Sequence, residues 1–157
     1  QARLVLESSK EEFPLELYDS YLGLGNVSYP QAKFREALTF YKKCVAPAVA
    51  SINRKAFWQG RIGIGRIKLA EGDYHGAKAD FSTIMKEIVS IQDIDVVTLS
   101  MAYSSMIECM TTIGQYQEAI DACDVAIKII KKHSSPKNTY IAVLLIYQGK
   151  GWRKVYE

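Results

Sequence analysis

The sequence predicts an all-α fold. Apolar residues recur every three or four positions, which is the period of an amphipathic helix and not that of a strand. In "AIDACDVAIKIIKK", the side chains of Ala119, Cys123, Ala126 and Ile130 fall on one side of such a helix. The Asn-Gly and Asp-Gly pairs that close β-hairpins do not occur in the 157 residues. A composition of 48% hydrophobic and 24% charged residues is typical of a soluble domain with one continuous core.

An internal repeat supports the same fold class. Three segments align without gaps: "YLGLGNVSYPQAKFREALTFYKKC", "RIGIGRIKLAEGDYHGAKADFSTI" and "YSSMIECMTTIGQYQEAIDACDVA". An alanine holds the same place in each segment, and the three alanines, Ala37, Ala77 and Ala119, lie 40 and 42 residues apart. An aromatic residue lies three positions before each alanine; these are Phe34, Tyr74 and Tyr116. A helix pair alone does not bury its apolar stripe, so such units are expected to stack on their neighbours.

These residues resemble the tetratricopeptide repeat family, over roughly residues 17 to 151. The matching positions are Tyr21, Leu24, Gly25, Phe34, Ala37 and Tyr41; then Ile64, Gly65, Gly72, Asp73, Tyr74, Ala77 and Phe81; then Tyr103, Met106, Gly114, Tyr116, Ala119 and Ala126; and last Tyr140, Val143, Leu144 and Tyr147. The spacing is longer than the usual ~34 residues, with long linking segments at 47–57 and 87–97. Long-spaced repeats of this kind look like those of kinesin light chain, of Pins-type polarity adaptors and, more loosely, of proteasome-lid and signalosome subunits.

The resemblance implies a right-handed superhelical solenoid of antiparallel helix pairs, with about three and a half repeats. Residues 1–16 are interpreted as the end of a preceding helix, and 17–53 as the first repeat. The second and third repeats are 54–96 and 97–136, and 137–157 is a partial fourth repeat or a capping helix. The chain begins with Gln1, so it is interpreted as a piece of a longer protein. The apolar "IAVLLIY" at 141–147 requires a cover, for which we expect further chain or self-association through this C-terminal helix.

Three glycines, Gly60, Gly63 and Gly65, lie among basic residues and raise the question of a phosphate-binding loop. Such a loop needs its glycines in a turn between a strand and a helix. These three fall inside a predicted helix, so nucleotide binding is not expected. Gly60 and Gly63 are interpreted as tolerated helix glycines, with close approach of a partner's backbone as the alternative. Gly72 is expected to end a helix before Asp73 caps the next one.

No catalytic, metal or cofactor site is predicted. The two histidines, His75 and His133, have no companion at ligand spacing on a shared helix face. Three cysteines, Cys44, Cys109 and Cys123, are expected to be buried in apolar stripes rather than reactive or paired. We therefore expect a non-enzyme in a reducing compartment, cytoplasmic or nuclear, with no membrane span.

The expected function is a protein–protein interaction scaffold that binds a partner peptide or helix on its concave face. The first helix of each pair lines this face in the family. The candidate residues are those of these helices that lie off the packing stripe: Asn26, Tyr29, Gln59, Ile62, Arg66, Leu69, Met101, Ser104, Glu108, Ile141, Leu145 and Gln148.

One family ligand, the acidic C-terminal tail of heat-shock chaperones, is not expected to bind. Family members hold such tails with a clamp of Lys, Asn, Asn, Lys and Arg. Only Asn26 matches that clamp, and the other four positions are Leu22, Gly63, Met101 and Ser105.

The alternative is binding of nucleic acid or another anionic partner at the C-terminal end, or a regulatory role as a peptide sensor. Residues 1–30 carry two basic and five acidic side chains, whereas 128–157 carry one acidic and seven basic side chains. The basic ones are Lys128, Lys131, Lys132, Lys137, Lys150, Arg153 and Lys154. Trp152 and Tyr156 would be stacking groups for bases. Part of this cluster is also explained by the preference for cations at a helix C-terminus.

Overall fold

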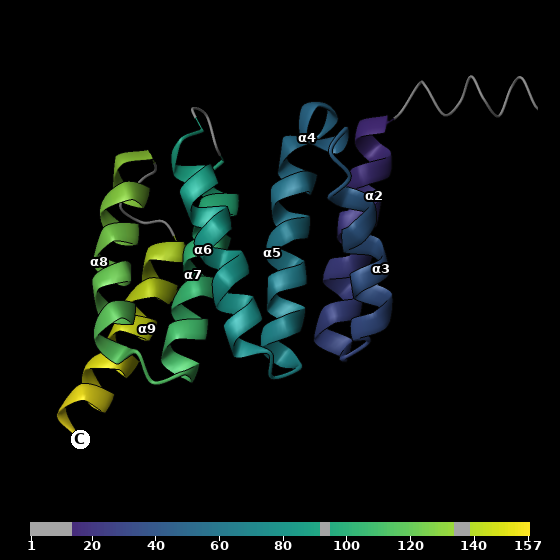
Figure 1. Cartoon of the computed structure of the whole chain (residues 1–157). Helices are drawn as coiled ribbons and strands as arrows, with labels where there is room; N and C mark the ends of the chain where they lie inside the picture. Colours follow the sequence, from purple (N-terminus) through teal and green to yellow (C-terminus); the bar gives the residue numbers. More distant parts are fainter. Residues whose placement is uncertain (1–13, 92–94, 134–138) are drawn as a thin grey trace, which may run out of the picture. The chain divides into compact units, whose positions relative to one another are not determined.

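The computed structural model describes residues 14–91, 95–133 and 139–157 and is all-helical within them (Figure 1). The elements are α2 (Pro14–Ser28), a short 3-10 helix η1 (Tyr29–Gln31), α3 (Phe34–Cys44), α4 (Val49–Ile52), α5 (Arg54–Ala70), α6 (Tyr74–Val89), α7 (Val96–Thr112), α8 (Tyr116–His133) and α9 (Thr139–Tyr156). The described ranges contain no strand. The all-α prediction is confirmed.

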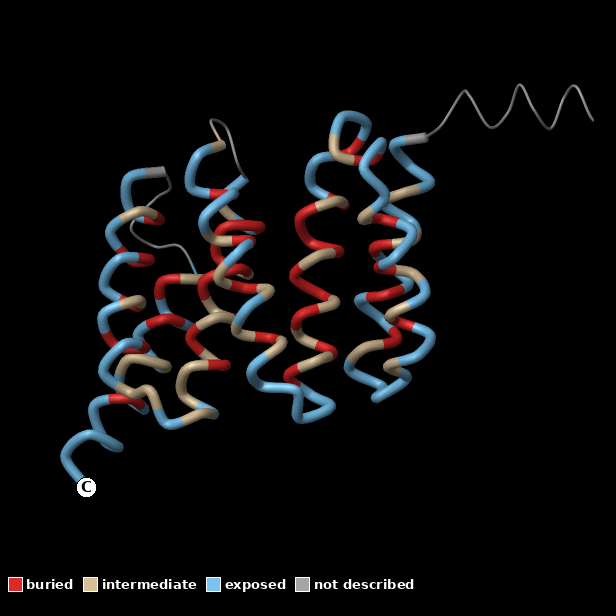
Figure 2. The backbone as a smooth tube through the Cα atoms, in the orientation of Figure 1, coloured by how far each residue is buried: buried red, intermediate tan, exposed pale blue. Residues whose placement is uncertain are grey.

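Contacts divide the chain into two compact units, residues 1–67 and 68–157, with the boundary inside α5. In the first unit, α2 packs against α3 and α4. The core is formed by Leu22, Ala37, Tyr41, Cys44, Ala56 and Ile67, with Tyr18, Tyr21, Tyr29, Phe34, Leu38 and Ile64 partly buried around it. Figure 2 shows that α5 is buried along most of its length, whereas α2 and α3 alternate between buried and exposed segments.

The second unit is built from α6 to α9, with α7 in contact with α6, α8 and α9. The apolar stripe predicted for α8 is confirmed, because Ala119, Cys123, Ala126 and Ile130 are all buried. Side chains from the other three helices complete the core, chiefly Phe81, Ile84, Ile88, Leu99, Ala102, Ile107, Ile141 and Leu144. Phe81, which holds the same position in the repeat as Tyr41, is likewise fully buried.

Three turns in the chain share one hydrogen-bonding pattern. Ala32, Gly72 and Gly114 each have positive φ, of 58°, 88° and 82°, and each lies five residues before an alanine of the repeat. The residue after each one donates its N–H to a carbonyl five positions back, in the pairs Lys33–Ser28, Asp73–Lys68 and Gln115–Met110. The left-handed residue itself donates to a carbonyl three positions back. This is the Schellman arrangement that ends an α-helix.

The predicted roles of Gly72 and Asp73 are confirmed. Gly72 takes the left-handed conformation that a side chain disfavours. The Asp73 carboxylate accepts a hydrogen bond from the N–H of Gly76 at 2.9 Å, which satisfies a free donor in the first turn of α6. Asp95 does the same for α7 by accepting from the N–H of Thr98. The first long linking segment holds the additional helix α4, and part of the second, 92–94, lies outside the described residues.

Gly60 and Gly63 are packing residues, which corrects their interpretation as merely tolerated. A Cβ added at Gly60 would lie 2.8 Å from the Cβ of Cys44. One added at Gly63 would lie 2.6 Å from the ring of Tyr41. Real Cβ atoms do not approach other carbons so closely, so α5 lies this near to α3 only because both positions lack a side chain.

Candidate partner-binding surface

The surface that carries the candidate site in the first unit is built around the side chain of Tyr41. Its ring lies between two glycines, Gly25 of α2 and Gly63 of α5, and added Cβ atoms would come within 2.5 Å and 2.6 Å of it. The ring therefore joins α2, α3 and α5 at one point. Because Tyr41 is 1% exposed, the position of this junction is fixed by packing.

The hydroxyl of Tyr41 reaches the surface of α2. It donates a hydrogen bond of 2.9 Å to Oδ1 of Asn26, whose side chain is exposed. Burial raises the pKa of Tyr41 to about 12, although the nearby Arg66 acts in the opposite direction. The hydroxyl is therefore protonated at neutral pH and acts as the donor. This bond fixes the orientation of the Asn26 amide.

Arg66 and Tyr29 complete the cluster. The guanidinium carbon of Arg66 lies 4.5 Å from the centre of the Tyr29 ring, in cation–π geometry. The ring of Tyr29 is held in turn by Phe34, with ring centres 5.7 Å apart. The structure thus brings together three of the residues predicted for the inner face, Asn26, Tyr29 and Arg66, which we call the Arg66 cluster.

Four other predicted residues are buried, which corrects the expectation that they face a groove. Ile62 has no exposed surface, and Gln59, Leu69 and Ile141 are 5%, 9% and 5% exposed. Ile62 and Gln59 lie on the same part of α5 as the close-packed Gly60 and Gly63. These four side chains serve packing and present little area to a partner.

The remaining predicted residues belong to the second unit. On α7, the half-buried Met101, Ser104 and Glu108 follow one another at spacings of three and four residues and therefore share one side of the helix. The Ser104 hydroxyl donates to the carbonyl of Met101 at 3.1 Å. On α9, Leu145 is 52% exposed, whereas Gln148 donates to the carboxylate of Asp124 on α8 at 2.7 Å. Gln148 is thus turned toward α8.

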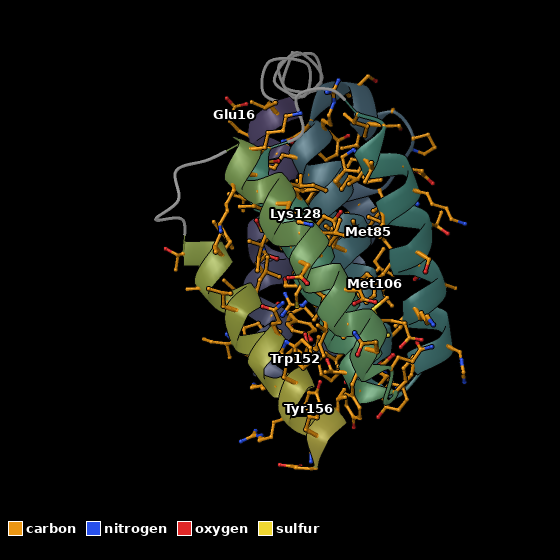
Figure 3. All side chains as sticks on the ribbon, turned by 90° about the vertical axis from the view of Figure 1, so that its left-hand side faces the viewer. Glu16, Met85, Met106, Lys128, Trp152 and Tyr156 are labelled. Atoms are coloured by element: carbon orange, nitrogen blue, oxygen red, sulfur yellow. The ribbon has the colours of Figure 1, made fainter. Side chains whose placement is uncertain are left out.

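The basic residues predicted as one patch form two groups. Gln148 contacts Asp124, and Gly151 lies against Ile120, so α8 and α9 run antiparallel. Lys128, Lys131 and Lys132 therefore lie toward one end of this helix pair, and Lys150, Arg153 and Lys154 toward the other, with the centres of the two groups about 17 Å apart along the axis at ~1.5 Å per residue. Figure 3 shows Lys128 on the upper part of α8, and Trp152 and Tyr156 at the lower end of α9. Lys137 lies outside the described residues.

Residues of the group at the end of α9 also make contacts with one another or with Glu157. Arg153 and Lys154 both pair with Glu157, at 3.9 Å and 3.0 Å. The predicted stacking residues Trp152 and Tyr156 stack on each other, with ring centres 5.5 Å apart. The two groups therefore do not form one continuous basic track along which a nucleic-acid backbone would run.

Two polar contacts that position the site were missed in the sequence. Asn53 is 6% exposed, and its side chain accepts from the N–H of Ala56 at the start of α5. Its amide nitrogen donates to the carbonyl of Leu15 and to the carboxylate of Asp19, both on α2. An asparagine directly before an amphipathic stretch is a helix N-cap signal, and that signal was available in the sequence. In the second contact, the Ser28 hydroxyl donates to the carboxylate of Glu36 at 2.9 Å. No local sequence signal predicts this contact, because it forms only when α2 and α3 pack together.

The three cysteines, whose thiols could act as nucleophiles or metal ligands, lie in the packed interior. All three cysteines are free and buried, as expected. Burial raises the pKa of Cys44 and of Cys123 to about 11 and also raises the pKa of Cys109.

Among the described residues, no group of three or more His, Cys, Asp or Glu side chains could hold a metal ion. No helix in the described ranges is long and apolar enough to cross a membrane.

Comparison with known proteins gives no relative: no family model, no curated protein and no solved structure matches the chain.

Proposed function

We propose that this chain is a non-catalytic protein-interaction scaffold of the tetratricopeptide type. In this proposal its helix pairs stack into a right-handed superhelix whose inner face binds a partner peptide or helix. The observation that carries it is the repetition of the Schellman turn at Ala32, Gly72 and Gly114, in register with the buried alanines of the repeat. Repetition of one helix pair with one turn is the basis of solenoid proteins, which use the surface of their stacked helices for binding.

The chemistry of the predicted surface supports a peptide as the ligand. The Arg66 cluster combines the amide of Asn26 on α2, the aromatic ring of Tyr29 in η1 and the guanidinium of Arg66 on α5. In the second unit, α7 presents a thioether, a hydroxyl and a carboxylate on one side, at Met101, Ser104 and Glu108. Aromatic, methionine and arginine side chains are enriched in protein interfaces and contribute much of their binding energy.

A peptide-display selection on the whole chain tests the proposal. A library of random twelve-residue peptides is selected on the native chain, and enriched peptides are then measured against two double variants. Arg66→Glu with Glu108→Arg reverses charges on the first helices of the pairs. Arg35→Glu with Glu118→Arg, the matched control, reverses exposed charges on the second helices, α3 and α8.

We expect the first double variant to lower peptide affinity at least about tenfold, because it places like charges opposite the partner's own. The control is expected to change affinity less than about twofold. The proposal fails if no peptide is enriched, or if the two double variants behave alike.

A further inference from the structure

One side of α9 carries large apolar side chains that the described part of the chain leaves exposed. Leu145, Ile146, Trp152 and Tyr156 are between 40% and 76% exposed. Leu145, Trp152 and Tyr156 follow one another at spacings of seven and four residues, so they share one side of the helix. Figure 2 shows the last part of α9 as exposed. We call these four residues the α9 stripe; contiguous exposed apolar surface of this kind marks a place where a partner packs.

A similar stripe lies on α2. Leu17, Leu24 and Val27 are all exposed, and spacings of seven and three residues place them on one side of the helix; we call them the α2 stripe. In its unit α2 packs against η1, α3 and α4, which follow it in the chain, whereas α9 packs against α7 and α8, which precede it. In a stack of helix pairs each inner helix has neighbours on both sides, and the first and last helices lack one.

The two helices carry opposite charges. The charged side chains of α2 are both acidic and those of α9 are all basic: Glu16 and Asp19, and Lys150, Arg153 and Lys154. Neighbouring groups reduce these charges but do not cancel them. Asp19 has Lys55 at 3.8 Å, and Arg153 and Lys154 share the single carboxylate of Glu157. The α2 stripe therefore lies in an acidic setting and the α9 stripe in a basic one.

The charges also lie at helix ends that meet in antiparallel packing. The acidic side chains belong to the first two turns of α2, and the basic ones to the last two turns of α9. Leu24 lies eight residues from Glu16, and Leu145 lies eight residues from Arg153. Both intervals are about 12 Å at ~1.5 Å per residue. One antiparallel alignment therefore brings the acidic end to the basic end and, at the same time, apolar residues of one stripe level with those of the other.

We propose that the α9 stripe is covered by α2 of a second copy of this chain, so that copies associate head to tail. This contact goes beyond the peptide-binding function proposed above. It gives the basic end of the chain an acidic protein partner in place of nucleic acid. Because the two surfaces in contact differ, each copy in a pair keeps one surface of each kind for a further copy.

The experiment is sedimentation equilibrium of the whole chain over a range of protein concentrations, at low and at high salt. We expect two-chain and larger species to form as the concentration rises. Salt screens the attraction between the acidic and basic ends, so raising it from about 0.05 M to about 0.5 M is expected to weaken association at least about threefold.

Two variants that each block one surface test the head-to-tail arrangement. Leu24→Lys changes the α2 stripe and Ile146→Lys changes the α9 stripe. We expect either variant alone to associate at least about tenfold more weakly, because the contact would bury an unpaired cation. An equal mixture of the two is expected to form a two-chain complex and nothing larger, because one variant supplies a native α2 and the other a native α9.

Val89→Lys, at an exposed position near the end of α6, is the matched control and is expected to leave association unchanged. All three substituted side chains are exposed, so the variants are expected to keep the far-ultraviolet circular dichroism of the native chain.

The inference is overturned if the native chain stays monomeric at every concentration, whether or not its basic end then binds an oligonucleotide. It is also overturned if Leu24→Lys associates like the native chain, which would indicate pairing of α9 with α9, if the mixture forms no two-chain complex, or if salt has no effect. These outcomes are separate from those of the peptide selection. A chain that enriches peptides and stays monomeric keeps the scaffold function and loses this inference, and a chain that assembles head to tail and enriches no peptide does the reverse.

Discussion

Tyr41 lies where three helices of the first unit meet, and the glycines on its ring leave no room for a methyl group. The ring fills a space that two missing side chains create. This kind of fit depends on residues at positions 25, 41 and 63, which are far apart in the sequence. Helical periodicity places each of them on a helix but says nothing of their mutual distance, so the fit was not predicted.

Replacing Gly63 by alanine is expected to destabilise the chain by about 1–3 kcal/mol, because the added methyl overlaps the ring of Tyr41. Gly149→Ala is the matched control. Gly149 also lies inside a helix, but an added Cβ would meet nothing within 4 Å, so this change is expected to stabilise by about 0.5–1 kcal/mol. Urea unfolding of the two variants measures both. A Gly63→Ala chain as stable as the native chain, or more stable, would show that the close approach at Gly63 is not a constraint.

The hydroxyl of Tyr41 gives stability a pH dependence. Its pKa is raised from 10.0 to about 12 in the folded chain, so the unfolded chain loses this proton first as pH rises. The stability that it contributes is complete below pH 10 and is lost progressively as pH rises toward 12. Tyr41→Phe removes the titrating group and one hydrogen bond, which costs roughly 1 kcal/mol at pH 7.

We therefore expect the native chain to be more stable than Tyr41→Phe at pH 7, and this advantage to shrink by about 1 kcal/mol by pH 11. Comparing the two chains by urea unfolding at each pH cancels the titration of all other groups. A difference that stays constant up to pH 11 would contradict the burial of this hydroxyl.

At the scale of the elements, the three turns form the same Schellman hydrogen bonds, although the residue in the left-handed conformation differs between them. Gly72 and Gly114 supply the left-handed conformation at little cost, whereas Ala32 adopts it at φ 58° against the preference of its Cβ. The first turn also contains Pro30 and the 3-10 helix η1. The same pair of backbone hydrogen bonds nevertheless forms in all three turns.

Ala32→Gly is expected to stabilise the chain by about 0.5–1 kcal/mol, because glycine adopts this conformation without strain. Gly72→Ala, the reciprocal change in the second turn, is expected to destabilise by a similar amount, about 1 kcal/mol. Thermal unfolding of both variants under identical conditions measures the two shifts. Destabilisation by Ala32→Gly would mean that the Ala32 methyl contributes more by contact than its backbone costs.

The elements and the site differ in how far the sequence predicts them. The helices, the helix end at Gly72 and the N-cap at Asp73 could be predicted, because each depends only on a few residues that are neighbours in the sequence. Helical spacing and the repeat predicted Asn26, Tyr29 and Arg66 for one face, although Tyr29 lies in η1 and their contacts with one another and with Tyr41 were not predicted. Ile62 and Ile141 were assigned wrongly to an open surface, because the period of one helix does not show how many neighbours cover it.

At the scale of the whole molecule, all three cysteines lie inside the packed helices. We expect their reaction with an aromatic disulfide reagent at pH 8 to be at least about a hundredfold slower in the folded chain than in urea. The raised thiol pKa values leave little thiolate, and burial blocks access to it. Stopped-flow absorbance with mass spectrometry of each cysteine measures the rates. Rapid labelling of any one of them in the folded chain would contradict its placement.

The ring of Tyr41 and its two glycines have a consequence for how this chain can change over generations. A mutation that enlarges residue 25 or 63 becomes acceptable only when residue 41 becomes smaller, so the three positions should vary together. Related chains with alanine or serine at either glycine position are therefore expected to carry a smaller side chain in place of the tyrosine. Such a chain would also lose the hydroxyl that donates to Oδ1 of Asn26, so the Asn26 amide would no longer be held in one orientation.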